Sequence, residues 1–424
     1  MQVREKIFRL NLDSLLAICF IMAYMVPYIN YKGGGDDLPF IIFSVWLTTV
    51  LLKKNQIDRL LYVLSFRKLE LSLLFIFFLV TLFYYFFVTT TNKAFQFTLV
   101  PIIYFFLIVI DAYYFSMDPQ FKLSIFFVTV VLLAIQAAIS IPYIFNSDDM
   151  ISRMYTSNEL EGPALEQALK NGVGSTVLYT SLIGIFFLGI GMLHKFTNKK
   201  MKVTLLISLL LILLSVVSSS YSTALAMLLT GGLILLVRSN WKKIKPKFIF
   251  LTLLFLIALG IFYNSFLTNS KVIEPIERKI QIIKRGTYRD EGRVGLAEVS
   301  WNTFLNHPFF GVGVPEWGRE KEVGEHMAWM DFAGHYGFFG FLPFLLFLAV
   351  LFKRNYKFYL RSPKSNIYAT SCLIGFTIFI LSNFINPFII SGPMIIPLLF
   401  FYTSMFNWDT SPLANKKFQQ KSFI

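Results

Sequence analysis

Residues 69–89 read LELSLLFIFFLVTLFYYFFVT, a run of 21 residues with a single charged side chain, that of Glu70. A helix of about 20 apolar residues is long enough to cross the hydrocarbon core of a membrane. The rest of the chain is similar, because 56% of its 424 residues are hydrophobic and only 15% are charged. Soluble domains carry about a quarter charged residues. This composition predicts an all-α polytopic membrane protein and excludes a water-soluble fold.

Further apolar runs of this kind predict about 12 transmembrane helices. They lie near residues 12–30, 38–52, 69–89, 95–116, 121–144, 173–194, 203–218, 221–237, 247–267, 336–352, 366–384 and 387–406. Only the turn at residues 218–221 separates the seventh run from the eighth, so the count of 12 depends on reading them as two spans.

The distribution of basic residues predicts the orientation of these helices. Cytoplasmic loops of membrane proteins are enriched in Lys and Arg. With the N-terminus inside, 26 of the 39 Lys and Arg residues fall in the predicted inner segments. We therefore expect both termini in the cytoplasm. The formal charge of +15 is then an orientation signal spread over several loops, which argues against nucleic acid as a partner.

Two predicted outer segments are long enough to fold. Residues 145–172 form the smaller one, with a helical pattern around 157–169, and residues 268–335 form a large extracytoplasmic loop. The predicted organisation is helices 1–9 within residues 1–267, the large loop at 268–335, helices 10–12 within 336–406, and a cytoplasmic tail at 407–424. Inside the large loop, apolar spacing predicts helices at 272–283 and 293–306.

The charges of the large loop are segregated along the sequence. Its first part carries Arg278, Lys279, Lys284, Arg285, Arg289 and Arg293, and its second part carries Glu316, Glu320, Glu322, Glu325 and Asp331. Arg binds phosphate oxygens through two parallel hydrogen bonds, so a basic cluster beside a membrane suits a phosphate or an anionic lipid. The alternative is that both clusters are solvated faces of helices lying on lipid headgroups.

Three short motifs in this loop carry a resemblance to a known family. They are EGR at 291–293, NHPFFGVG at 306–313 and HMAWMDFAGHYGFFG at 326–340. Their order and spacing resemble the signature of the O-antigen ligase and O-antigen polymerase superfamily. In that signature a Gly-Arg pair opens a helix, a Pro-x-x-Gly-x-Gly turn follows, and a His lies eleven residues before a Gly-x-x-Gly that starts the next helix.

The resemblance implies a fold and an activity. Such proteins resemble GT-C-type glycosyltransferases and act on the outer face of the bacterial plasma membrane. They move a glycan from undecaprenyl diphosphate to an acceptor hydroxyl, with inversion at the anomeric centre and without a metal or another cofactor. The acceptor is a carrier-linked glycan in polymerases and lipid A-core in ligases. A flippase and a chain-length regulator are the further partners implied.

The resemblance also assigns site residues. His326 would be the base that activates the acceptor hydroxyl, and Arg293 would bind the diphosphate leaving group. This chemistry is sound on general grounds, since His has a pKa near neutrality and an Arg at a helix start stabilises a developing negative charge. Asp331 matches the acidic or polar position five residues after the His.

The sequence departs from the family pattern at two positions. Many members have an Arg in the turn between the two spans before the large loop, where this chain has Tyr221. We expect Arg285, Arg289 or Lys284 to supply the missing phosphate contact. Many members also have a Glu two residues before the Gly-x-x-Gly, where this chain has His335. Tyr221, Asp331 and His335 are therefore secondary candidates for binding sugar or acceptor.

Several functions stay open at this stage. We favour a polymerase over a ligase on the general abundance of polymerases. A transporter of lipid-linked sugars would place ionisable residues deep in the bundle. Asp13 and Glu70 are each the second residue of a predicted span, and Asp111 is the one acid further inside a span. We expect Asp111 to reach towards the inner membrane surface. A non-catalytic scaffold is the third alternative.

Gly311, Gly313, Gly337 and Gly340 are predicted to permit tight turns and close helix contacts.

Overall fold

The computed structural model describes most of the helices that the sequence predicts. It describes residues 11–34, 37–65, 67–89, 91–116, 119–146, 161–196, 198–219, 221–238, 293–314, 323–324, 327–363 and 366–385. Within these ranges every regular element is a helix and no strand is present. The predicted spans at 247–267 and 387–406, and the predicted helix at 272–283, lie outside the described residues.

The helices follow the apolar runs closely. They are α1 (Leu12–Met25), α2 (Pro27–Lys32), α3 (Asp37–Leu51), α4 (Lys54–Ser65), α5 (Lys68–Phe87), α6 (Asn92–Ser116), α7 (Pro119–Asn146), α9 (Gly162–Lys170), α10 (Thr176–Met192), α11 (Lys199–Ser218), α12 (Ser222–Arg238), α15 (Arg293–Asn306), α16 (Ala328–Arg361) and α17 (Ile367–Ser382). A single 3-10 turn, Leu193–Lys195, follows α10.

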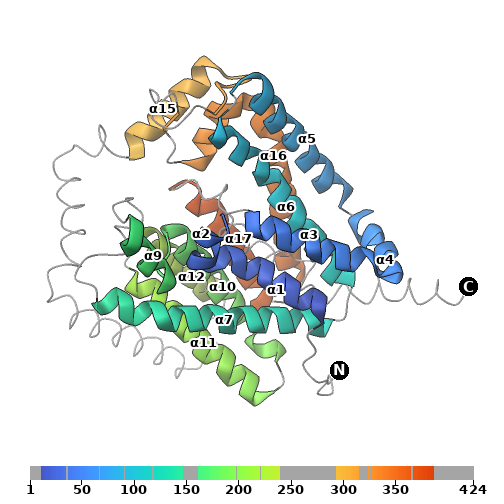
Figure 1. The fold of residues 1–424 in the computed structure, drawn as a ribbon, viewed down its shortest axis with the longest axis vertical. Coiled ribbons are helices and arrows are strands. Elements are labelled where there is room, and N and C mark those ends of the chain that lie inside the picture. The colour runs from blue at the N-terminus through green and yellow to red at the C-terminus, as the bar shows by residue number, and fades with distance from the viewer. Residues whose placement is uncertain are drawn as a thin grey trace, which may run out of the picture.

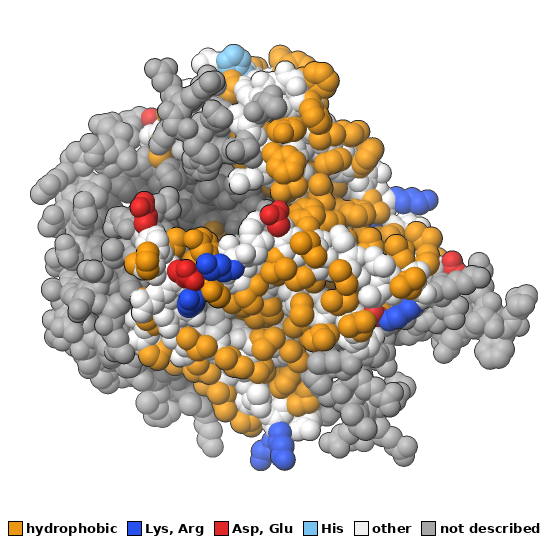
Figure 2. Space-filling model, viewed as in Figure 1, with side chains coloured by type: hydrophobic (Ala, Val, Ile, Leu, Met, Phe, Trp, Pro, Cys, Tyr) orange, Lys and Arg blue, Asp and Glu red, His pale blue; other side chains and the backbone are white. Residues whose placement is uncertain are grey.

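Five of the described helices are long and apolar enough to cross a membrane. They lie at Lys68–Phe87, Ala94–Tyr114, Leu123–Ile144, Lys199–Ser218 and Ala328–Arg361. Five further apolar helices are shorter. Large hydrophobic side chains remain exposed on the outside of the bundle, among them Ile41, Phe75 and Phe87. Figure 2 shows hydrophobic side chains covering much of one face, with few charged groups among them. Such a surface suits lipid as the surrounding solvent.

The helices pack in pairs that are often distant in sequence. α7 lies along α11, α10 along α17, and α5 along both α6 and α16 (Figure 1). α15 packs on α16 at one end of the molecule (Figure 1). The short amphipathic helix α9 packs against α2, so the smaller predicted outer segment contributes a helix beside the first hairpin.

The helix α16 starts earlier than the sequence predicts and is broken. The predicted span begins at residue 336, whereas α16 begins at Ala328. The backbone leaves helical geometry at Gly337, where φ is 61° and ψ is −169°. A short segment, residues 328–336, therefore precedes the long apolar one. Only glycine adopts such a φ readily, which explains why the break falls at this residue.

The two ends of the α5, α6 and α16 bundle differ in chemistry. We call the end where α5 finishes and α16 begins the motif end, because the loop motifs lie there. We call the opposite end the ionic end, because buried charges gather on it. The ionic end is formed by the start of α5, the last turns of α6 and the C-terminal half of α16.

A buried ion network occupies the ionic end and corrects one prediction. Asp111 was expected to reach towards the membrane surface, but it is 1% exposed and its Oδ2 lies 3.2 Å from Nη2 of Arg67. Glu70 is also fully buried, and its Oε1 lies 2.7 Å from Nε of Arg354 and 3.5 Å from Nη1 of Arg67. The prediction was wrong because the compensating cations come from α5 and α16, which sequence spacing does not reveal.

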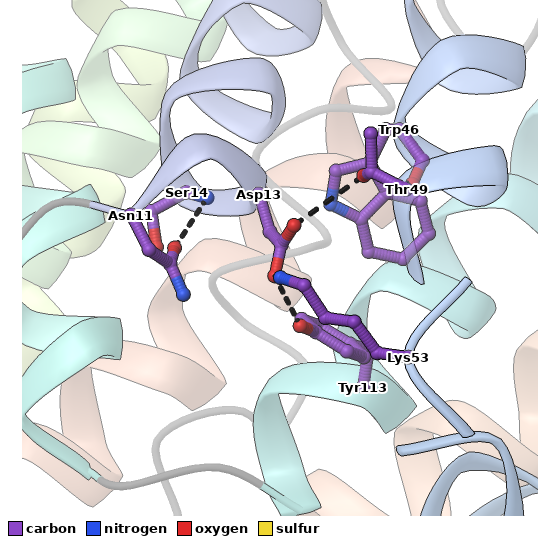
Figure 3. Close-up of polar contacts among 7 residues, drawn as sticks. All are labelled: Asn11, Asp13, Ser14, Trp46, Thr49, Lys53 and Tyr113. Carbon is purple, nitrogen blue, oxygen red and sulfur yellow. Dashed lines mark hydrogen bonds and ion pairs between the residues drawn. The ribbon is translucent and has the colours of Figure 1, made fainter. Parts of the chain in front are cut away.

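A third buried carboxylate, that of Asp13, lies at the same end of α6. Asp13 is fully buried at the start of α1 and accepts a hydrogen bond from the hydroxyl of Tyr113 at 2.6 Å (Figure 3). Lys53, which follows α3, forms an ion pair with it, and Thr49 donates a further bond at 3.3 Å (Figure 3). The carboxylate of Asp13 therefore joins α1, α3 and α6.

Candidate functional site

The Pro-x-x-Gly-x-Gly turn docks onto the break in α16. In an unbroken helix the amides of residues 338 and 339 would donate to the carbonyls of residues 334 and 335. Here these two amides and two carbonyls form hydrogen bonds with the turn instead. Phe338 N donates to Pro308 O at 2.7 Å, Phe339 N to Phe309 O at 3.1 Å, Val312 N to Gly334 O at 3.1 Å and Gly313 N to His335 O at 2.8 Å. The four backbone groups that the break releases are thus all bonded again by one motif.

This docking requires glycine at two positions. Gly311 has φ 64°, and a side chain there would meet the carbonyl oxygen of Gly334 at 2.5 Å. A side chain at Gly337 would meet the carbonyl carbon of Phe309 at 2.4 Å. The prediction that these glycines permit tight turns and close contacts is confirmed.

Side chains from the end of α5 and from the connection between α5 and α6 fix the other side of the turn. The hydroxyl of Tyr84, near the end of α5, donates to the carbonyl of Phe310. Thr89 Oγ1 accepts from Val314 N at 3.1 Å, and Thr91 Oγ1 donates to Val314 O at 3.2 Å. Sequence reasoning did not identify these three residues, because about 220 residues separate them from the turn.

His335 lies inside this assembly. Its side chain is 1% exposed, and Nδ1 lies 2.7 Å from the carbonyl oxygen of Gly313. A carbonyl can only accept, so Nδ1 carries a proton. The ring also meets Phe97 edge to face, with ring centroids 5.4 Å apart. His335 therefore bonds to the turn through both its side chain and its backbone.

Asp331 lies one turn before His335 on α16 and connects α16 to α15. Its side chain is 3% exposed. Oδ1 accepts a hydrogen bond from Ser300 Oγ of α15 at 2.6 Å, and Oδ2 accepts from Met327 N at 2.9 Å. The structure thus brings Asp331 and His335 together at the start of α16.

The remaining candidates are placed differently. Arg293 is the first residue of α15, as the Gly-Arg motif predicts. His326, Arg285 and Arg289 lie outside the described residues. Tyr221 precedes α12 and is 7% exposed, with its ring 5.5 Å from Tyr179 and its hydroxyl 3.5 Å from the carbonyl oxygen of Gly174. Tyr221 therefore packs on the start of α10.

The described residues include no group of three or more His, Cys, Asp or Glu side chains that could hold a metal ion. What the motif end offers is a helix, α15, that begins with an Arg and packs on α16. Free amides at a helix start and a guanidinium both favour an anionic group.

Comparison with known proteins identifies the same region. Residues 206–345 match the family model described as O-antigen ligase, about a third of the chain. The match runs from within α11 through α12 and α15 into α16, so it includes all three loop motifs and the docked turn. No curated protein matches the chain. By this match, residues 206–345 are similar to the O-antigen ligase family, and the apolar helices indicate a multi-pass membrane protein.

Proposed function

We propose that this protein is a membrane glycosyltransferase that polymerises undecaprenyl-diphosphate-linked oligosaccharide units into a surface polysaccharide. The observation that carries the proposal is the arrangement at the motif end. Arg293 opens α15, and α15 is bonded through Ser300 to Asp331 on α16, five residues after His326. The family match supports a function of the O-antigen ligase or polymerase type.

The proposed reaction is a single displacement at the anomeric carbon. The acceptor hydroxyl oxygen forms a bond to this carbon, while the bond to the diphosphate oxygen breaks and its electron pair leaves with the diphosphate. The hydroxyl proton passes to His326. A single displacement inverts the anomeric centre, and no redox partner or metal is needed to balance the step.

Arg293 stabilises the leaving group in this proposal. As the diphosphate leaves, negative charge grows on its bridging oxygen. The guanidinium and the amides in the first turn of α15 both favour that charge. Arg285 and Arg289 lie eight and four residues before Arg293 and supply further phosphate contacts in this proposal. They replace the Arg that many family members have at the position of Tyr221.

Burial assigns Asp331 and His335 a supporting role. Both side chains are 3% exposed or less, and both are bonded to backbone groups of the motifs. We therefore propose that they fix the shape of the site, and that His326 and Arg293 contact the substrates.

The proposed setting is the outer face of a bacterial inner membrane, with both termini in the cytoplasm. A flippase would deliver the carrier-linked unit and a chain-length regulator would act on the product. A ligase is the second candidate, favoured by the family description, and would transfer the glycan to lipid A-core.

The test is carrier release by the purified protein in lipid nanodiscs. The probe is undecaprenyl-diphosphate-linked repeat units extracted from a strain that lacks this protein, with or without lipid A-core, and the readout is released undecaprenyl diphosphate. Removing a general base costs about 100- to 10,000-fold in rate, and removing a charge-stabilising donor about 100- to 1,000-fold. We expect losses of this size for His326→Ala and Arg293→Ala.

Two matched controls belong to this experiment. His307→Ala removes an exposed histidine from the neighbouring turn, and Arg361→Ala removes an exposed arginine from the far end of α16. Both should keep the wild-type rate. Release that requires lipid A-core would make the protein a ligase. Wild-type rates in both His326→Ala and Arg293→Ala would contradict the proposal.

A further inference from the structure

Four phenylalanine side chains lie exposed where the turn docks onto α16. Phe309 and Phe310 belong to the turn, Phe338 and Phe339 belong to α16, and each is between 50% and 66% exposed. The ring centroid of Phe339 lies 5.8 Å from that of each of the other three. We call these four side chains the phenylalanine cluster. A contiguous exposed aromatic patch of this kind marks a contact with lipid or with protein.

The phenylalanine cluster continues the apolar outer faces of the two long helices that carry it. On α5 the exposed side chains of Phe75, Leu79 and Phe83 recur every four residues, which places them on one face of the helix. On α16 the exposed Leu345 and Leu346 follow the cluster after two helical turns, on the same face as the cluster. The cluster is therefore the end of a surface whose remainder faces lipid.

The sequence around this surface contains no formal charge. Asp, Glu, Lys and Arg are absent from residues 71–92, 301–314 and 332–352. On the side of α5, Figure 2 shows hydrophobic side chains reaching up to the end of the molecule where α15 lies. A surface for a water-exposed loop would carry charged side chains, so this composition favours lipid.

Two exposed lysines mark one edge of the membrane on these helices. Lys68 begins α5, and Lys353 lies in the C-terminal half of α16, both at the ionic end. Phe77 stacks on Phe344 with ring centroids 4.7 Å apart, and each lies nine residues from the lysine of its own helix. The two lysines are therefore at the same level. Exposed charges are costly in hydrocarbon, so this level is a membrane boundary.

The phenylalanine cluster lies within one membrane thickness of that boundary. Phe338 is 15 residues from Lys353, which is about 23 Å along a helix that rises about 1.5 Å per residue. Tyr84, whose hydroxyl donates to the carbonyl of Phe310, is 16 residues from Lys68, about 24 Å along α5. The hydrocarbon core is about 30 Å thick, and any tilt of the helices reduces the depth that they span. Both helices thus place the cluster inside the hydrocarbon, near its far edge.

The backbone bonding of the turn is compatible with this depth. An irregular segment is tolerated in hydrocarbon only if the protein itself bonds its backbone groups, because no water is present to do so. The carbonyls of Pro308, Phe309 and Phe310 accept bonds from α16 or α5. The amides of residues 311–313 donate to protein carbonyls, the first of them to His307 O at 2.9 Å. The side chains of the turn can therefore contact lipid while its backbone bonds to the helices.

We infer that the Pro-x-x-Gly-x-Gly turn and the adjoining end of α16 are embedded in the lipid leaflet at the motif end, with bilayer lipid covering the phenylalanine cluster. This contact goes beyond the proposed function, because it holds whether or not His326 and Arg293 act as proposed. It also places part of the predicted extracytoplasmic loop inside the membrane. Under the proposed function, transfer then takes place at the level of the lipid headgroups, where the diphosphate of a lipid carrier lies.

The test is the accessibility of nitroxide spin labels on the full chain in vesicles of phosphatidylethanolamine and phosphatidylglycerol. One label at a time is attached to Phe310→Cys, in the turn, or to Phe339→Cys, on α16. Both variants are made in a Cys19→Ala background, because Cys19 is exposed, whereas Cys372 is fully buried and stays in place. Thermal unfolding confirms that each labelled variant is folded. If the label in the turn prevents folding, the label on α16 decides the test.

Two reference labels calibrate the measurement. Phe75→Cys lies on the lipid-facing side of α5, and Glu161→Cys lies at an exposed position just before α9. Oxygen dissolves well in hydrocarbon, whereas a neutral nickel chelate stays in water. We expect oxygen collisions at Phe310 and Phe339 to match those at Phe75. Nickel collisions should be more than about tenfold below those at Glu161, because hydrocarbon excludes a polar complex that finds no hydrogen-bond partner there.

Each outcome decides the inference. High oxygen and low nickel collisions at the phenylalanine cluster support it. Nickel collisions equal to those at Glu161 would overturn it, because the turn would then lie in water. Low collisions with both reagents would also overturn it, because protein, either another segment of this chain or a second copy, would then cover the cluster. Carrier release plays no part in these readouts, so the inference and the proposed function can fail separately.

Discussion

The motif end and the ionic end of the same three helices are held together in different ways. At the motif end, neutral backbone hydrogen bonds join the turn at 308–314 to the break in α16. At the ionic end, the buried charges of Arg67, Glu70 and Asp111, together with Arg354 of α16, join α5, α6 and α16. Backbone bonds fix atomic positions without introducing charge. Under the proposed function, such bonds suit an end that binds an anionic substrate.

The buried charges also bear on the transporter alternative. Ionisable residues within a bundle often mark transport pathways. Here the carboxylates of Asp13, Glu70 and Asp111 are each bonded to a cation from another part of the chain, which makes them ties between helices. The comparison therefore predicts that damage to the ionic end lowers stability, and damage to the motif end lowers activity.

The largest expected effect on stability is at the ionic end. Asp111→Ala leaves the cationic side chain of Arg67, which is 3% exposed, with one fewer anion. Breaking a buried ion pair by removing one partner costs about 3–5 kcal/mol. Thermal unfolding in nanodiscs should show this loss, while the fraction that stays folded keeps its kcat. Asp58→Ala, on the exposed side of α4, is the control and should be nearly neutral. A loss of kcat in the folded fraction as large as that of the motif-end variants would contradict the claim that the ionic end acts on stability.

The next effect is at the motif end. Gly337→Ala places a side chain 2.4 Å from Phe309 at a φ of 61°. We expect a stability loss of roughly 1–3 kcal/mol and a fall in carrier release of more than about tenfold, because the turn cannot dock. Gly232→Ala is the matched control, since a side chain there meets nothing within 4 Å. A fully active Gly337→Ala variant would show that docking of the turn is dispensable.

A smaller change at the motif end is Tyr84→Phe. It removes the hydroxyl that donates to the carbonyl of Phe310 and leaves the ring in place. The expected loss is about 1 kcal/mol of stability, with a reduction of a few fold in carrier release. Tyr85→Phe, at a half-buried neighbour on α5, serves as the control. The two rates are to be measured side by side, and equal values would contradict a role for the Tyr84 bond.

The smallest effect is expected at the surface contact between α2 and α9. Glu166 Oε1 lies 3.1 Å from Lys170 Nζ and 3.4 Å from Lys32 Nζ. The bond from Lys170 lowers the pKa of Glu166, and Lys32 adds to this effect. The folded pKa is below the unfolded one, so the contact stabilises the protein at neutral pH and this contribution is lost as pH falls through the folded pKa.

This surface contact can be measured against a charge-free variant. Exposed ion pairs contribute little, so Glu166→Gln should change the unfolding temperature only slightly at pH 7 and not at all below the lowered pKa. A pH-independent difference between Glu166→Gln and wild type would mean that packing, and not charge, explains the contact.

Local patterns allowed much of the fold to be predicted. The helix expected at 293–306 is Arg293–Asn306, and the span expected at 69–89 is Lys68–Phe87. Hydrophobic periodicity and capping act over a few residues, so one sequence is enough to recognise them. The structural task of Gly311 and Gly337 was predictable for the same reason, since the motif itself contains the turn.

Contacts between distant segments could not be predicted in this way. The pairing of Asp111 with Arg67, the bonds of Thr89 to Val314 and the Ser300–Asp331 contact all depend on which helices become neighbours. Ser300 carries no signal in the sequence, because a serine within a helix is ordinary until its partner is known. The burial of His335 was likewise hidden, since its position in the motif suggested a substrate contact.

The most direct test of the central claim is the length of surface glycan in a deletion strain. The strain is complemented with wild type, His326→Ala, Arg293→Ala or Asp111→Ala, with membrane levels of each protein checked by immunoblot. We predict that wild type restores long chains, and that the two motif-end variants leave single repeat units at normal protein levels. Asp111→Ala should lower the protein level and restore long chains in proportion. Long chains at wild-type amounts from both motif-end variants would contradict the assignment of the chemistry to the motif end.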